Sequence, residues 1–97
     1  MRRILFSPQA RRELAEAWHY IAPDNVSAAD HLVQRISQAV ETLARLPGMG
    51  HQRDDVPDSK LFFWTVRPYV IAYRFTSRTL RIVRIVHGAR DFRRIFS

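Results

Sequence analysis

The residues of this sequence with the clearest potential for chemistry are one histidine and a set of arginines near the ends of predicted strands. Phosphodiester cleavage without a metal needs a base for the attacking hydroxyl, an acid for the leaving oxygen, and cations for the charge of the phosphorane. His87 has the side chain of an acid or base, and the positive charge would come from Arg67, Arg74, Arg81 and Arg90. Alternatively, His87 is a hydrogen-bonded structural residue at a strand end. The residue types therefore leave open a nuclease centre and an anion-binding surface.

The positive charge is concentrated in the second half of the chain. The net charge is +7, and 15 of the 16 cations are arginine, with Lys60 the only lysine. Residues 1–48 contain six arginines and five acidic residues, whereas residues 49–97 contain ten cations and four acidic residues, so the halves carry +1 and +6. The planar guanidinium group favours bidentate binding of phosphate or carboxylate. This distribution predicts a nucleic acid, an acidic protein or an anionic surface as partner; the alternative is an arginine preference inherited from a GC-rich genome.

Residue type and spacing exclude several other kinds of site. The chain has no cysteine, which excludes disulfides, thiolate metal sites and a cysteine nucleophile. The four histidines lack the paired spacing of metal ligands, the three glycines form no phosphate-binding loop, and no serine lies in a nucleophile elbow. No apolar run approaches the ~18–20 residues of a membrane span, and the apolar stretch near Met1 is too short for a signal peptide. We therefore expect a cytoplasmic protein without metal or cofactor.

The periodicity of the apolar residues predicts an α+β fold in one domain, residues 1–97. Ser7 and Pro8 are a helix-start signal, and helical spacing continues to about Ala22. A second helix is expected from a capping box at Ser27 to about Leu46. A weak strand in residues 2–6, strands over 61–66, 69–75 and 80–87, and a short helix-like tail over 89–96 complete the chain. The expected order is β-α-α-β-β-β, with a helical hairpin packed on one face of an antiparallel-rich sheet.

A tight turn at residues 77–78 would place Phe75 opposite Leu80 and so assign the last two strands to faces. The helix-facing side would carry Tyr69, Ile71, Tyr73, Phe75, Leu80, Ile82, Arg84 and Val86, packed on Leu14, Trp18, Leu32, Ile36 and Val40. The other side would carry Val70, Ala72, Arg74, Arg81, Val83, Ile85 and His87. Arg74 would then lie opposite Arg81, and because like charges in such a pair cost about 0.2–1 kcal/mol, an anion or a partner's carboxylates are expected there. Alternatively, both side chains splay into water.

Four segments resemble the RelE/ParE toxins, in order and over nearly the whole chain. Residues 10–22 resemble the first helix of these toxins, and residues 43–50 resemble the end of their second helix. Residues 67–74 are similar to the central strand, and Arg84-Ile-Val-His87-Gly-Ala-Arg-Asp91 is similar to the closing motif of the ParE-like branch. The chain is accordingly identified as a ParE-like member of this superfamily.

The resemblance implies the toxin of a type II toxin–antitoxin pair. Such toxins are neutralised by a cognate antitoxin. Its C-terminal segment, expected to be acidic and amphipathic to match this chain, would dock in a groove or add a strand to the sheet. DNA would be contacted only through the toxin–antitoxin complex. ParE-like members act on DNA gyrase, whereas RelE-like members cut mRNA in the ribosome. This chain ends in Arg93-Arg94-Ile95-Phe96-Ser97 without a terminal tyrosine and lacks a lysine-rich catalytic patch, which favours gyrase.

Two alternatives to a gyrase poison stay open: a ribosome-dependent endoribonuclease that uses His87, Arg74 and Arg81, and a non-toxic antitoxin-binding relative. In the ParE-like branch the histidine has no assigned catalytic role, so a hydrogen bond of His87 or Asp91 to the C-terminal tail is the simpler expectation. The surface expected to bind antitoxin or target comprises Arg67, Arg74, Arg81, Val83, Ile85, Arg90, Arg93 and Arg94.

Overall fold

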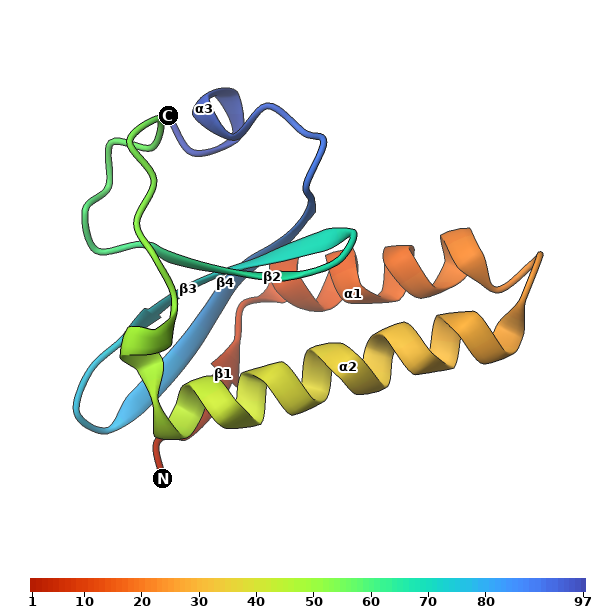
Figure 1. The fold of residues 1–97 in the computed structure, drawn as a ribbon, viewed down its shortest axis with the longest axis horizontal. Helices are drawn as coiled ribbons and strands as arrows, with labels where there is room; N and C mark the ends of the chain where they lie inside the picture. Colours follow the sequence, from red (N-terminus) through yellow and green to blue (C-terminus); the bar gives the residue numbers. More distant parts are fainter.

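The computed structural model describes all of residues 1–97 and confirms the α+β class and the predicted element order (Figure 1). The elements are β1 (Arg3–Phe6), α1 (Pro8–Ile21), α2 (Val26–Arg45), the 3₁₀ helix η1 (Pro47–Met49), β2 (Phe62–Val66), β3 (Tyr69–Phe75), β4 (Thr79–His87) and α3 (Phe92–Ile95). The four strands form one sheet in the order β1-β4-β3-β2. β1 pairs with β4 in parallel and the other two pairings are antiparallel.

The two long helices begin at side chains that cap their first turns. Ser7 caps α1 as predicted, its hydroxyl accepting the Ala10 N–H. α2 is capped by Asn25, whose side chain accepts the Ala28 N–H, so the prediction of Ser27 as cap was wrong by two residues. Asparagine is as effective at this position as serine, and it starts the helix earlier. Neither helix combines the length and apolar content needed to cross a membrane.

Apolar clusters lie on both faces of the sheet. α1 and α2 lie side by side on one face, whereas α3 lies on the other (Figure 1). The predicted contact of α2 is confirmed, since Leu32, Ile36 and Val40 are buried against the strands. The smaller cluster of the second face includes Phe63 and Phe92, the latter from α3. The second face is therefore partly covered by the end of the chain itself.

The contact of α1 with the sheet differs from the prediction for Trp18. The residues of α1 that are fully buried are Ala10 and Ala17, and Leu14 packs partly buried beside them. Trp18 is half-buried and its indole N–H donates to Asp30 of α2 at 2.8 Å. Small alanines let α1 approach the strands closely, and the large indole lies at the seam between the two helices instead.

The predicted register of β3 and β4 is confirmed next to their turn. Phe75 pairs with Leu80 and Arg74 pairs with Arg81. The turn is closed by the Thr76 N–H, which donates to the Thr79 carbonyl at 2.9 Å. The two arginines are therefore directly opposite each other on the face away from the helices.

A β-bulge at Val83 overturns the predicted faces of the rest of β4. Tyr73 pairs with Ile82, but the preceding residue Ala72 pairs with Arg84, so Val83 is extra. A shift of one residue moves every later side chain to the opposite face. The prediction was therefore wrong for three residues: Ile85 and His87 lie on the helix-facing side, and Val86 lies on the other. Arg84 pairs with Ala72, but its guanidinium extends to Glu13 of α1.

Candidate functional site

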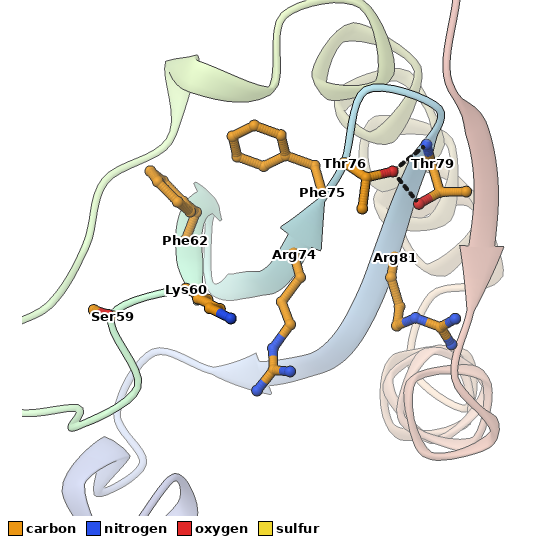
Figure 2. Close-up of a pocket in the computed structure, with 8 residues that line it drawn as sticks. All are labelled: Ser59, Lys60, Phe62, Arg74, Phe75, Thr76, Thr79 and Arg81. Atoms are coloured by element: carbon orange, nitrogen blue, oxygen red, sulfur yellow. Dashed lines mark hydrogen bonds between the residues drawn. The ribbon is translucent and has the colours of Figure 1, made fainter.

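Three cations line a hollow where β2, β3 and β4 meet at one end of the sheet. We call it the basic hollow; its volume is about 520 Å³. Figure 2 shows the eight residues that line it: Ser59, Lys60, Phe62, Arg74, Phe75, Thr76, Thr79 and Arg81. Three of them are cations and two are phenylalanines, so the hollow offers both charge and apolar surface.

The cations of the basic hollow are unequally neutralised. Arg74, whose side chain is 49% exposed, forms an ion pair with Asp58 at the rim. Arg81 and Lys60 are exposed and form no ion pair. The register of the strands holds Arg74 and Arg81 opposite each other, and Asp58 neutralises only Arg74, so the charges of Arg81 and Lys60 are available to an anion. The hollow is thus suited to bind a carboxylate or phosphate group.

The apolar wall of the basic hollow is built by two phenylalanine rings, tilted at 58° to each other, on the helix-facing side of the sheet. The ring centroids of Phe62 and Phe75 are 5.2 Å apart, and both rings are half-buried against the main core. The guanidinium of Arg2 lies 5.7 Å from the centroid of Phe75. The rings are consequently held in place where they line the hollow.

Val83 and Ile85, both predicted to share a surface with Arg74, lie in different environments. Val83 lies with Arg74 in a shallow groove that adjoins the hollow, between Asp58 and the C-terminal Phe96. Ile85, in contrast, is 2% exposed and packs in the main core. The bulge causes this difference, so the predicted placement of Ile85 on the binding surface was wrong.

His87 lies at the far end of β4 and is not brought together with Arg74 and Arg81. Its ring packs edge-on against Tyr69, with centroids 5.4 Å apart, on the helix-facing side. Its Nδ1 accepts the Ala89 N–H at 3.1 Å, the kind of contact to the tail that the sequence suggested. Of the residues proposed from the sequence for a nuclease centre, only Arg90 shares a pocket with His87, and Arg74 and Arg81 lie at the other end of the strands.

The remaining predicted arginines are scattered over the surface. Arg67 lies in the β2–β3 turn, and its carbonyl accepts a hydrogen bond from Arg35. Arg90 lines a pocket with His87, beside α1. Arg93 and Arg94 are exposed on α3, whose first turn is capped by Asp91. None of these four arginines lines the basic hollow.

Lys60 was missed as a site residue, although the sequence contains a signal for it. Residues 67 and 68 form a two-residue connection, so counting back from the pair Val66 and Tyr69 places Phe62 opposite Tyr73. The chain just before Phe62 must then lie near the end of β3. A lysine there would meet the arginine pair.

A second missed feature is the loop contact of Arg53 with the tail. Its guanidinium makes two hydrogen bonds of 2.9 Å to Asp55 and lies 4.1 Å from the ring centroid of Phe92. The Arg53 hydrogen bond lowers the pKa of Asp55 and raises that of Arg53 itself. The loop before β2 is thereby fastened to α3. No group of three or more potential metal ligands occurs in the chain.

Comparisons with known proteins confirm the resemblance seen in the sequence. Residues 4–92 match the family described as ParE toxin of type II toxin-antitoxin system, parDE. The chain is 34% identical over 87 residues to the protein named "Putative toxin Y4kP" of Sinorhizobium fredii, covering 90% of this chain and 88% of that protein.

Three solved structures share the fold. A chain of the chromosomal ParDE system of P. aeruginosa has a TM-score of 0.72 at 21% identity, covering 90% of this chain and 96% of that one. The E. coli DinJ-YafQ toxin-antitoxin complex gives 0.64 at 13% identity, covering 94% and 97%. The YoeB dimer of Staphylococcus aureus gives 0.61 at 17% identity, covering 89% and 95%.

Proposed function

The chain belongs to the ParE toxin family of type II toxin–antitoxin systems, and on this premise we propose that it arrests growth by poisoning DNA gyrase and is neutralised by a cognate antitoxin. The observation that carries the choice of gyrase is the separation of His87 from Arg74 and Arg81. His87 and Arg81 are six residues apart on β4, roughly 20 Å at ~3.3 Å per residue, and they point to opposite faces.

This separation argues against a metal-free nuclease built from these residues. A general acid or base must come within about 3 Å of the proton it transfers, close to the cations that stabilise the phosphorane. In the basic hollow, Lys60 is the only lining side chain of a type that commonly serves as acid or base. A surface that binds another protein fits the hollow better than a cleavage centre.

The antitoxin follows from the family and from charge. The family is defined by the parDE pair, and the matching P. aeruginosa structure is of a ParDE system. The cations around the hollow and on α3 favour an acidic segment as the partner. Contacts with DNA would then be made through the toxin–antitoxin complex.

The test is plasmid supercoiling by purified gyrase with and without the folded chain, scored for lost supercoiling and for trapped cleaved DNA. We expect inhibition that the antitoxin reverses, and we expect His87→Ala to inhibit as well as the unmodified chain, because His87 is remote from the hollow. Intact supercoiling together with mRNA cleavage in ribosome reactions would overturn the gyrase proposal in favour of the RelE-like activity. No growth arrest on expression without antitoxin would identify a non-toxic relative.

A further inference from the structure

The basic hollow is also a gap in the edge of the sheet. β2 begins at Phe62, opposite Tyr73, whereas β3 continues to Phe75, so the last residues of β3 have no neighbouring strand on that side. Thr76 directs its N–H toward β4. Since backbone groups alternate in direction along a strand, Phe75 directs its N–H and carbonyl toward the vacant side. These two groups form a short free edge that an extended segment could pair with.

The two faces of this gap differ in chemistry. On the helix-facing side are the rings of Phe62 and Phe75, and Figure 2 shows Arg74 and Arg81 extending from the opposite side of the strands, with Lys60 beside Arg74. In an added strand, successive side chains point to opposite faces. One side chain would therefore meet the two rings, and the next would meet the cations.

We propose that this gap receives an extended segment of the antitoxin in which an apolar residue is followed or preceded directly by an acidic one. The segment pairs with the Phe75 backbone, and its apolar side chain packs on Phe62 and Phe75. Its carboxylate lies beside Lys60 and Arg74, and Arg81 is the next cation beyond Arg74 (Figure 2). This proposal rests on the antitoxin partner given under the proposed function and specifies where and how that partner binds.

A peptide fits these features better than a nucleic acid. The free N–H and carbonyl of Phe75 are complementary to a peptide backbone, which offers both a donor and an acceptor at the spacing of a strand. Arg74 already binds a carboxylate, that of Asp58, in this location. Lys60 and Arg81 provide charge for one more carboxylate, and guanidinium groups bind carboxylates through two parallel hydrogen bonds.

The single lysine allows a direct footprint of the site. An amine-acetylating reagent modifies only Lys60 and the N-terminal amine of Met1, which is 81% exposed and serves as internal reference. We expect the antitoxin encoded beside this chain to slow acetylation of Lys60 severalfold relative to Met1 in the complex, measured by mass spectrometry. Equal rates for Lys60 in the free and bound chain would overturn the proposal.

Charge reversal provides an independent test with a matched control. Arg81→Glu and Lys60→Glu should weaken antitoxin binding by roughly tenfold or more, as removal of a close interfacial charge pair does. Arg78→Glu makes the same change of charge at an exposed position of the neighbouring turn, outside the hollow, and should change the dissociation constant by less than about threefold. A glutamate-to-arginine change in the antitoxin segment should restore binding to Arg81→Glu. Circular dichroism and the melting temperature establish that each variant is folded.

The outcomes separate this proposal from the one it rests on. If the unmodified chain does not bind the antitoxin at all, the proposed partner is wrong. If it binds and Arg81→Glu binds as Arg78→Glu does, the partner stands and the site is wrong. If Arg81→Glu loses affinity only for a single-stranded RNA or a duplex DNA probe, the hollow is a nucleic-acid site and the peptide proposal is overturned.

Discussion

At the scale of single residues, the position that most constrains the chain around the site is Gly50. The buried hydroxyl of Tyr73 donates to the Pro47 carbonyl at 2.5 Å and accepts the Gly50 N–H at 3.0 Å, which fastens the chain after α2 to the centre of the sheet. Burial raises the pKa of Tyr73 above its ordinary value. Gly50 has an ordinary negative φ, and its requirement for glycine comes from the closeness of the Tyr73 ring and the Phe63 carbonyl oxygen.

Gly50→Ala is therefore expected to destabilise the protein by roughly 1–3 kcal/mol, as overpacking of a closed site does. A methyl group there would overlap the Tyr73 hydroxyl and approach the Phe63 carbonyl oxygen to 2.9 Å. Gly48→Ala is the control, because nothing lies within 4 Å of a methyl group at that position. Urea unfolding measures both variants, and equal midpoints for the two would contradict the expectation.

At the scale of elements, local signals decided which predictions held. The cap at Ser7 and the turn at residues 76–79 depend on neighbouring residues only, so the start of α1 and the pairing of Arg74 with Arg81 could be predicted. The bulge in β4 could not be predicted in this way. Ser7 donates its N–H to the Ile82 carbonyl and its hydroxyl to the Val83 carbonyl, at 2.9 and 2.7 Å, so two consecutive carbonyls of β4 point the same way.

That arrangement needs a partner about 75 residues away in the sequence, which no alternation pattern reveals. The same reasoning separates the site residues. The arginine pair follows from one local turn, whereas Lys60 joins it only through the pairing of β2 with β3. The misplacement of Ile85 and His87 is a direct consequence of the unseen bulge.

The joint between α1 and β4 depends on Glu13. Its carboxylate accepts from Arg84 at 2.7 and 2.9 Å and from the Ile85 N–H at 2.9 Å, where β4 has run past the end of β1. The side chains of Glu13 and Arg84 are only 10% and 23% exposed. Glu13→Ala would leave a largely buried guanidinium and a backbone N–H without partners, and we expect a loss of about 2–4 kcal/mol.

Glu16→Ala is the matched control for this prediction, since it removes the same charge one turn along α1 from an exposed residue without an ion pair. It should change the free energy of unfolding by less than about 0.5 kcal/mol. Thermal and urea unfolding provide the measurement. A loss for Glu13→Ala no larger than that for Glu16→Ala would mean that the joint is unimportant.

The loop contact at Arg53 predicts a pH dependence. The Arg53 hydrogen bond lowers the pKa of Asp55 in the folded protein, so the stabilisation is complete above the ordinary pKa and is lost as the pH falls through the lowered one. Asp55→Asn should therefore be less stable than the unmodified chain at pH 7, and this difference should vanish once the pH falls below the lowered pKa of Asp55. Asp54→Asn, at an exposed neighbour without an ion pair, should retain the unmodified pH profile of the urea midpoint. A constant difference at all pH values would exclude the ion pair as its cause.

At the scale of the whole molecule, the uneven charge of the sequence becomes an uneven charge in space. Residues 1–48, with a net charge of +1, form the helical layer and the edge strand β1, whereas residues 49–97, with +6, form the rest of the sheet, its second face and the tail. An acidic partner is consequently attracted to the side of the sheet away from the helices. Salt weakens this attraction because the screening length is only about 10 Å at 0.1 M.

The association rate constant with the antitoxin should therefore fall with added salt. The effect of a charge change on this rate constant should depend on where in the molecule the changed residue lies. The double variant Arg93→Glu with Arg94→Glu changes exposed residues of α3, and Arg11→Glu with Arg12→Glu makes the same change on the exposed side of α1. Steering acts on the association rate more than on dissociation. In stopped-flow measurements the α3 pair should slow association severalfold and the α1 pair by less than about twofold. Equal slowing by the two pairs would mean that association depends only on the total charge of +7. It would contradict the expectation that the antitoxin first contacts the side of the sheet away from the helices.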